Sequence, residues 1–193
     1  MSLAVFAAVI LCAQSAIDVE IENKNVDRTI DLTSQLVKIS YKITLEHKTK
    51  KPITSYLFMV PTEERERLAF ISAKDSSKKD LKLTETASPK GVTFSMTLPA
   101  GSTSPVVYIE TVFSKSLAPY PTAISQTERQ LVQYFGNVYF YSPFKTVTQK
   151  TTVHLSSRNV ESYTQFKPAV HSDTTITYGP YDNVAGKIGL LLT

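Results

Sequence analysis

Alternating apolar and polar residues dominate the sequence and predict β-strands. In residues 37–45 an apolar side chain occupies every second position, and Lys, Ser and Thr fill the positions between. Residues 92–98 and 151–155 repeat this period of two, which is typical of a strand with one face in a core and one in water. The continuous apolar runs at residues 56–60 and 106–109 predict inner strands that are covered on both faces.

Turn signals built from Pro or Gly separate these runs, so the sequence predicts many short strands and few helices. We therefore expect an all-β fold, an antiparallel β-sandwich with one or two short helical turns. Ser125 and Glu128 have the spacing of a capping box, which predicts a short helix over residues 126–130. Residues 63–67, which follow Pro61, predict one further helical turn.

Residues 134–144 are dense in Tyr and Phe. Gly136 and Asn137 lie between β-prone stretches and predict the turn of a hairpin. Neighbouring side chains of a strand point to opposite faces, which leaves two interpretations. Both faces lie in the core of the sandwich, or one face is a docking surface, since Tyr is favoured in interface hot spots. The candidate interaction surface consists of Tyr134, Tyr139, Tyr141 and Phe144.

The two ends of the chain differ from its centre. Leu3–Ala13 is an apolar run of the length of a signal-peptide core, followed by small residues suited to cleavage. We expect a signal peptide over residues 1–16, a β-sandwich domain over 17–186 and a divergent or truncated tail over 187–193. Two alternatives remain open: the first run is a buried strand or helix, and the tail is a last edge strand.

Length and charge narrow the class of protein. The chain has 193 residues, enough for one domain that folds on its core alone. Its one cysteine, Cys12, lies in the expected signal peptide, so an exported domain would carry no disulfide. The net charge is +4, and the excess of cations lies within residues 42–90 among acidic residues. A nucleic-acid-binding domain normally has a denser basic stripe, so we expect no nucleic-acid partner.

A search for reactive residues is negative. The sequence has no Gly-rich phosphate loop and no Gly-x-Ser-x-Gly elbow, and its three His are far apart. Glu63 and Glu64 lie beside Arg65 and Arg67, which favour ionised carboxylates, whereas a general acid needs a raised pKa. We therefore expect no catalytic residue, no cofactor and no metal.

Several segments together resemble one protein family. They are Val-Asp-Arg-Thr-Ile-Asp-Leu at residues 26–32, Leu-Ala-Pro-Tyr-Pro-Thr at 117–122, Ile-Ser-Gln-Thr-Glu at 124–128, Gly-Asn-Val-Tyr-Phe-Tyr-Ser-Pro at 136–143, Ser-Arg-Asn-Val-Glu-Ser-Tyr at 157–163 and Tyr-Gly-Pro at 178–180. These segments are similar to ribophorin I, subunit 1 of the oligosaccharyltransferase complex of the endoplasmic reticulum. The resemblance extends from about residue 25 to about residue 182.

The resemblance implies a location and partners. Residues 17–186 would be a lumenal β-sandwich domain on the endoplasmic-reticulum membrane. Other oligosaccharyltransferase subunits would be its partners, and the nascent polypeptide is left open as a further one. Family members carry a membrane anchor further along. We therefore expect membrane association through the complex, or through a carboxy-terminal anchor that is missing here.

The resemblance also implies a function. The complex transfers a preassembled glycan from a dolichol carrier to Asn of nascent chains, and its catalytic site belongs to a different subunit. This chain would thus support N-linked glycosylation through protein–protein contacts and would be no enzyme by itself. The alternative is a secreted β-sandwich binding module with an aromatic ligand face. An enzyme is the third interpretation, and it needs a convergent polar site that the sequence does not reveal.

Overall fold

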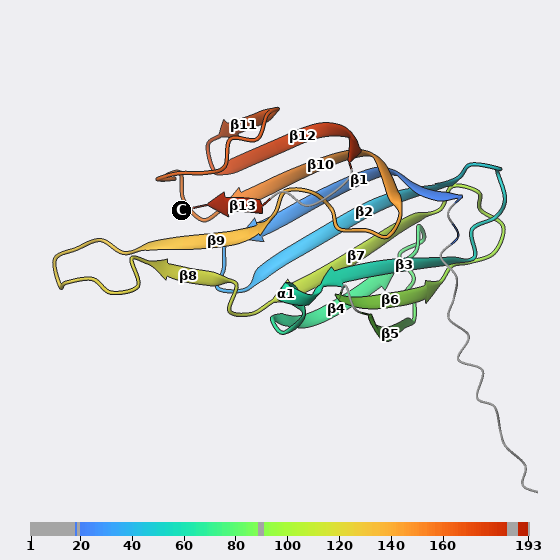
Figure 1. Ribbon diagram of the computed structural model, residues 1–193, viewed down its shortest axis with the longest axis horizontal. Helices are drawn as coiled ribbons and strands as arrows, with labels where there is room; N and C mark the ends of the chain where they lie inside the picture. The colour runs from blue at the N-terminus through green and yellow to red at the C-terminus, as the bar shows by residue number, and fades with distance from the viewer. Residues whose placement is uncertain (1–17, 19, 89–90, 185–188, 193) are drawn as a thin grey trace, which may run out of the picture.

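The computed structural model describes residues 18, 20–88, 91–184 and 189–192 (Figure 1). The expected signal peptide lies outside the described residues. The elements, in chain order, are β1 (Ile21–Leu32), β2 (Val37–His47), β3 (Ser55–Pro61), α1 (Thr62–Arg65), β4 (Leu68–Lys74), β5 (Leu83–Ser88), β6 (Gly91–Thr97), β7 (Val106–Phe113), β8 (Leu117–Tyr120), β9 (Leu131–Asn137), β10 (Lys145–Leu155), β11 (Ala169–Ser172), β12 (Thr175–Val184) and β13 (Gly189–Leu192). The expectation of an all-β fold is confirmed.

A seven-stranded sheet is the frame of the molecule, with the order β11-β12-β10-β1-β2-β7-β4. Its neighbours are antiparallel except β1 and β10, which run parallel from the pair Glu22–Lys145 to the pair Leu32–Leu155. The antiparallel arrangement predicted from the sequence is therefore confirmed for the other pairs of this sheet and does not hold at this one. The alternation of side chains is the same in parallel and antiparallel strands, so the sequence pattern carries no direction.

Two three-stranded sheets accompany the large one, with the orders β3-β6-β5 and β13-β9-β8. The sheet that contains β3 packs on the inner face of β1 and β2. Tyr56 of β3 donates its hydroxyl hydrogen bond to Asn23 of β1 at 2.9 Å, and the ring centroids of Phe58 and Tyr41 are 5.1 Å apart. On the opposite face of β2, Lys38 is exposed to water. These contacts give the sandwich arrangement its core.

The period-two prediction locates most strands correctly. Residues 37–45 lie in β2, residues 92–97 in β6 and residues 151–155 in β10. The two apolar runs also form strands, and β7 lies between β2 and β4 as expected for an inner strand. However, β3 is an edge strand, so that expectation was wrong for residues 56–60. An apolar run reports how far a strand is covered by packing, and this does not fix how many strands pair with it.

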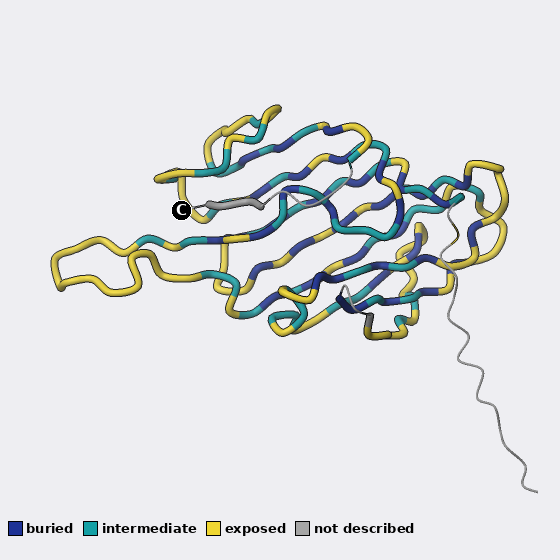
Figure 2. The backbone as a smooth tube through the Cα atoms, viewed as in Figure 1, coloured by how far each residue is buried: buried dark blue, intermediate teal, exposed yellow. Residues whose placement is uncertain are grey.

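Of the two predicted helical turns, only the one that follows Pro61 forms, and it is α1. Residues 126–130 form one turn followed by irregular chain instead of a helix, although the Glu128 carboxylate accepts the predicted hydrogen bond from the Ser125 N–H at 2.7 Å. This part of the chain is exposed along its length, so no apolar face packs against the body to stabilise a helix as short as this (Figure 2).

The predicted hairpin turn at Gly136 and Asn137 was wrong. Strand β9 continues through both residues and ends at Asn137. A Cβ atom at position 136 would lie 2.4 Å from the Tyr134 hydroxyl oxygen, because the Tyr134 side chain lies across the glycine. The glycine therefore makes room for a buried aromatic ring within a strand.

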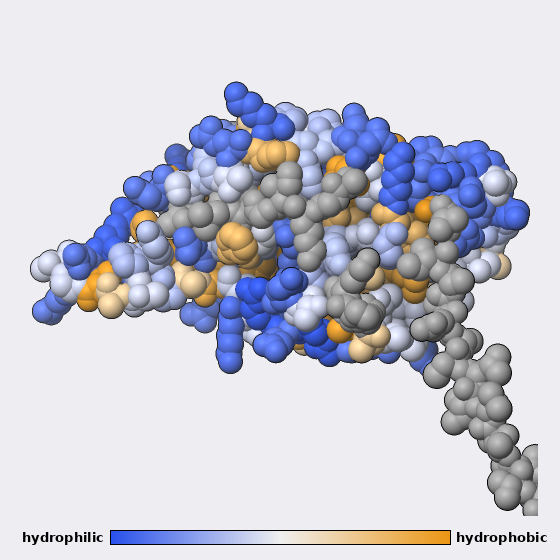
Figure 3. Space-filling view, viewed as in Figure 1, coloured by the Kyte–Doolittle hydropathy of each residue, from blue (hydrophilic) through white to orange (hydrophobic). Residues whose placement is uncertain are grey.

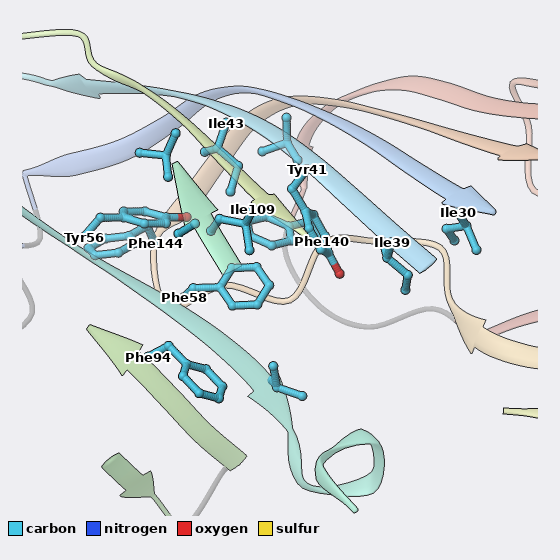
Figure 4. Packing of buried hydrophobic residues seen from close by; sticks show 14 of the residues in the cluster. Ile30, Ile39, Tyr41, Ile43, Tyr56, Phe58, Phe94, Ile109, Phe140 and Phe144 are labelled. Carbon is cyan, nitrogen blue, oxygen red and sulfur yellow. The ribbon is translucent and has the colours of Figure 1, made fainter. Parts of the chain in front are cut away.

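Residues 138–144, here called the aromatic segment, cover part of the inner face of the large sheet without forming a strand. Phe140 packs on Tyr41 with ring centroids 5.4 Å apart. Phe144 stacks on Tyr56 with ring centroids 5.2 Å apart. Figure 4 shows the two side chains next to each other. Each such ring that is withdrawn from water contributes about 1.5–3 kcal/mol to folding, so the segment is part of the core.

Because the aromatic segment has no strand partner, side chains of the sheet satisfy its backbone. Gln149 of β10 is fully buried; its Oε1 accepts from the Phe140 N–H and its Nε2 donates to the Val138 carbonyl oxygen, both at 2.8 Å. The Thr151 hydroxyl donates to the same carbonyl at 3.2 Å. These bonds replace the ladder that a strand would supply.

Asn23 of β1 anchors the other end of the aromatic segment. Its side chain is fully buried, and its Nδ2 donates to the Ser142 hydroxyl at 3.0 Å and to the Thr146 hydroxyl at 3.1 Å. Its Oδ1 accepts from the Tyr56 hydroxyl. One amide thus joins the aromatic segment, β10 and β3, the three parts that meet at this end of the core.

Gln149→Leu tests this arrangement. The leucine keeps the volume but leaves the Phe140 N–H without its partner and weakens the bonding of the Val138 carbonyl, so we expect a loss of about 2–5 kcal/mol of unfolding free energy. The matched control is Gln130→Leu, the same change in the exposed loop between β8 and β9, with an expected loss of unfolding free energy below about 0.5 kcal/mol. Urea unfolding of both variants measures the difference. Equal losses would show that the glutamine bonds carry no stability.

Buried tyrosines make the fold sensitive to alkaline pH. Burial raises the pKa of Tyr56, Tyr134 and Tyr178 above the ordinary value, and that of Tyr181 to about 12. The folded chain therefore keeps phenol protons that the unfolded chain releases near pH 10. The stability that they contribute is complete below about pH 10 and is lost as pH rises toward the folded-state values.

We therefore expect the free energy of unfolding to fall above about pH 10, by up to about 1.4 kcal/mol per pH unit for each tyrosine that titrates only after unfolding. Tyr181→Phe should flatten this slope, and Tyr120→Phe, at an exposed position, should leave it unchanged. Urea unfolding at a series of pH values gives the slopes. Identical slopes for the wild-type chain and Tyr181→Phe would contradict the assignment.

Candidate functional site

Arg28 brings a positive charge into the core, where β1 faces the start of the aromatic segment. Its side chain is 4% exposed. Nη1 donates to the Asn137 carbonyl oxygen at 2.5 Å and lies 3.5 Å from that of Val138. The guanidinium carbon is 5.7 Å from the centre of the Tyr41 ring, within the range of a cation–π contact. The cation therefore fixes the point at which β9 passes into the aromatic segment.

The surroundings of Arg28 keep it charged. Burial alone would lower the pKa of Arg28, but the nearby Tyr41, Tyr134 and Glu64 outweigh burial and raise it. Burial has the opposite effect on the phenols and raises the pKa of Tyr41 and Tyr134. Glu64 of α1 accepts a hydrogen bond from the Asn137 Nδ2 at 3.0 Å. The cluster therefore connects β1, β2, α1 and β9.

Two polar side chains of this cluster meet at Asn137. Arg28 Nη1 donates to its carbonyl oxygen and Glu64 accepts from its side-chain amide, whereas the buried Arg28 Nε has no hydrogen-bond partner within the described residues. Within the described ranges, no group of three or more His, Cys, Asp or Glu side chains lies close enough together to hold a metal ion. His47 is buried with its Nε2 3.4 Å from an Asp18 carboxylate oxygen, while His154 is exposed on β10.

The structure divides the four residues of the candidate interaction surface into two pairs. Tyr134 is 5% exposed and Phe144 is 7% exposed, so the core interpretation holds for both. Tyr139 and Tyr141 are half-buried. The Tyr139 ring makes edge contacts with the ring of Tyr181 at 5.4 Å. The docking surface remains a prediction. Of its four residues, Tyr139 and Tyr141 are the two that are partly exposed to solvent.

A second apolar surface lies on residues 117–137, here called the arm. It comprises β8, β9 and the tip between them, and it projects beyond the large sheet (Figures 1 and 2). Val132 is 62% exposed and Phe135 is 65% exposed, and Tyr120 and Ile124 are also exposed. Figure 3 shows apolar atoms interspersed along this projection. The sequence analysis did not identify these residues as a surface.

A signal for the arm was present in the sequence. Residues 131–135 are Leu-Val-Gln-Tyr-Phe, which is apolar in both phases of a strand. β9 is the central strand of the small sheet β13-β9-β8. Val132 and Phe135 lie three residues apart, on opposite faces of β9, and both are exposed. Only the projection of the arm beyond the large sheet turns the pattern into a surface.

A cleft of about 230 Å³ lies at the base of the arm, here called the arm cleft. Leu117 and Leu131 of the arm form one wall, and Leu32 and Leu155, at the ends of β1 and β10, form the other. Arg129 lies at its rim. Gln130, Ser156, Ser157 and Asn159 also line the arm cleft, so it combines a leucine side with a polar side that includes Arg129.

The part of the chain that the structure describes contains no helix long and apolar enough to cross a membrane.

Solved structures with a similar fold include a hydrolase and an aminopeptidase. Native leukotriene A4 hydrolase from Saccharomyces cerevisiae matches 90% of this chain and 29% of its own length, with a TM-score of 0.57 and 9% identity. Aminopeptidase A from Legionella pneumophila matches 92% of this chain and 22% of its own length, with a TM-score of 0.52 and 13% identity. At such identities the likeness concerns the fold alone.

Sequence comparison identifies closer relatives. Dolichyl-diphosphooligosaccharide–protein glycosyltransferase subunit 1B of Arabidopsis thaliana is 34% identical over 94% of this chain and 42% of its own length. Dolichyl-diphosphooligosaccharide–protein glycosyltransferase subunit 1 of Caenorhabditis elegans is 34% identical over 83% of this chain and 28% of its own length. The chain thus spans less than half the length of these relatives. The Ribophorin I family model matches residues 21–188, and the chain therefore belongs to the ribophorin I family.

Proposed function

We propose that this domain is a non-catalytic, lumenal part of an oligosaccharyltransferase subunit at the endoplasmic-reticulum membrane. In this role it supports N-linked glycosylation of nascent proteins through contacts with the other subunits. Support for the complex comes from the relatives, which are named as subunit 1 of the dolichyl-diphosphooligosaccharide–protein glycosyltransferase. Because this chain covers less than half of each of them, its share in the work of the complex is itself part of the proposal.

The observation that carries the contact role is the concentration of exposed apolar side chains on the arm. Single exposed apolar residues are common on soluble domains, but Val132, Phe135, Tyr120 and Ile124 all lie on one projecting hairpin, with Val132 and Phe135 on opposite faces of β9. We take this concentration on one short hairpin as the mark of a protein-interaction surface. An exposed Phe and Tyr are also the residue types that serve as anchors in interface hot spots.

The non-catalytic part of the proposal rests on how the converging polar groups are used. Gln149, Asn23 and Arg28 all point at the aromatic segment or its start and bond to it. A catalytic group needs an open position for a reacting atom. These three side chains are buried under the segment that they hold.

Co-purification from detergent-solubilised microsomes tests the proposal. We expect the tagged chain to recover oligosaccharyltransferase subunits, and the double variant Val132→Ser/Phe135→Ser to recover at least roughly tenfold less, the size of a lost hot spot. The matched control is Phe70→Ser/Val170→Ser, which removes exposed apolar side chains from β4 and β11, away from the arm.

A folded chain that recovers no such subunit would contradict the proposal. Release of that chain into the medium would favour the alternative, a secreted binding module. Equal recovery with the two double variants would keep the complex but remove the arm as its contact.

A further inference from the structure

We propose that the edge of β9 is a docking site for an extended apolar strand of a partner protein. This strand would pair antiparallel with β9, enter the arm cleft and place a carboxylate beside Arg129. The proposal deepens the contact role above, on which the identity of the partner rests.

The first argument is that this edge already accepts a strand. β13, with the sequence Gly-Leu-Leu-Leu, pairs antiparallel with β9 from the pair Gly189–Asn137 to the pair Leu192–Tyr134. The family match covers residues 21–188, so β13 lies directly outside it. The matched region therefore provides an acceptor edge, and the strand that occupies this edge comes from outside that region.

The second argument is that β13 covers only part of the edge. It pairs with residues 134–137, whereas β9 begins at Leu131. Among the described residues, Leu131 and Val132 have a strand neighbour on the β8 side alone. A strand in the register of β13 that continued past Tyr134 would run along these residues, and so to the arm cleft that both of them line.

The third argument concerns what such a strand would meet. Strand addition obtains affinity from main-chain hydrogen bonds and specificity from pockets that take alternate side chains. Leu32, Leu117 and Leu155 line one side of the arm cleft of about 230 Å³ and offer an apolar wall for one such side chain. An apolar strand with a sequence like that of β13 therefore fits the edge and this wall.

The positive charge of Arg129 predicts which residue follows the docked strand. Arg129 is exposed at the rim and makes no ion pair with any described residue. The nearby Arg158 differs, since its Nε lies 2.5 Å from an Asp173 carboxylate oxygen and it does not line the cleft. An acidic residue that follows the apolar strand would pair with Arg129.

A labelled peptide tests the docking site with the purified full chain. The probe is Gly-Leu-Leu-Leu-Thr-Leu-Asp, which copies β13 and places Leu opposite Val132 and Asp opposite Leu131, next to Arg129. The acceptor is the chain with Leu190→Pro/Leu191→Pro. One of two adjacent residues donates its N–H across an antiparallel pair, and proline removes that donor, so this variant frees the edge.

We expect saturable binding to the proline variant, measured by fluorescence anisotropy, and binding at least roughly tenfold weaker to the wild-type chain, in which β13 competes. Arg129→Gln should weaken binding about two- to fivefold, as for an exposed ion pair, and the matched control Arg158→Gln should leave it unchanged. A peptide with Asn in place of Asp should lose this dependence on Arg129.

Absence of saturable binding to a folded proline variant would overturn the proposal, as would equal effects of Arg129→Gln and Arg158→Gln. If the proline variant loses its native circular dichroism, the wild-type chain is titrated at higher peptide concentration, with the same two arginine variants deciding. The peptide-binding assay contains no other subunit, so it tests the docking site independently of the complex. Peptide binding together with a failed co-purification would contradict the proposed role in the complex and would still support the docking site on β9.

Discussion

An irregular segment can lie in a dry core only if its backbone N–H and C=O groups find partners there, and this requirement shapes the whole molecule. The aromatic segment meets it with side chains instead of a strand. Gln149 bonds its centre, Asn23 bonds its far end, and Arg28 bonds the residues that lead into it. All three come from β1 and β10, the parallel pair at the middle of the large sheet.

The position of the arm follows from the same bonds. Arg28 and Glu64 hold Asn137 from two sides, so β9 leaves the body in a fixed direction. The Tyr134 ring packs across Gly136 and keeps the inner half of β9 in the core. The outer half then projects with Val132 exposed. The contacts that stabilise the inner end of β9 thereby also position the exposed residues and the strand edge to which we assign protein contacts.

The sequence predicted what depends on local pattern and missed what depends on distant partners. The alternation in residues 37–45 locates β2, because burial on one face leaves a period of two. The parallel pairing of β1 and β10, more than a hundred residues apart, left no local trace. The polar side chains in the core were detectable: Arg28 lies in phase with Val26 and Ile30, and all three are buried. The family was found through the resemblance, whereas the arm became a surface only once β8 and β9 were placed on a projection beyond the large sheet.

Amide hydrogen exchange at Phe140 tests most directly whether buried side chains hold the aromatic segment. Phe140 lies outside every strand, yet its N–H donates to the fully buried Gln149 side chain. The account predicts that this amide exchanges as slowly as that of Val153 within β10, and at least about a thousandfold more slowly than that of Thr127 in the exposed tip. Exchange of the Phe140 amide as fast as that of Thr127 would show that the segment opens freely and would contradict the account.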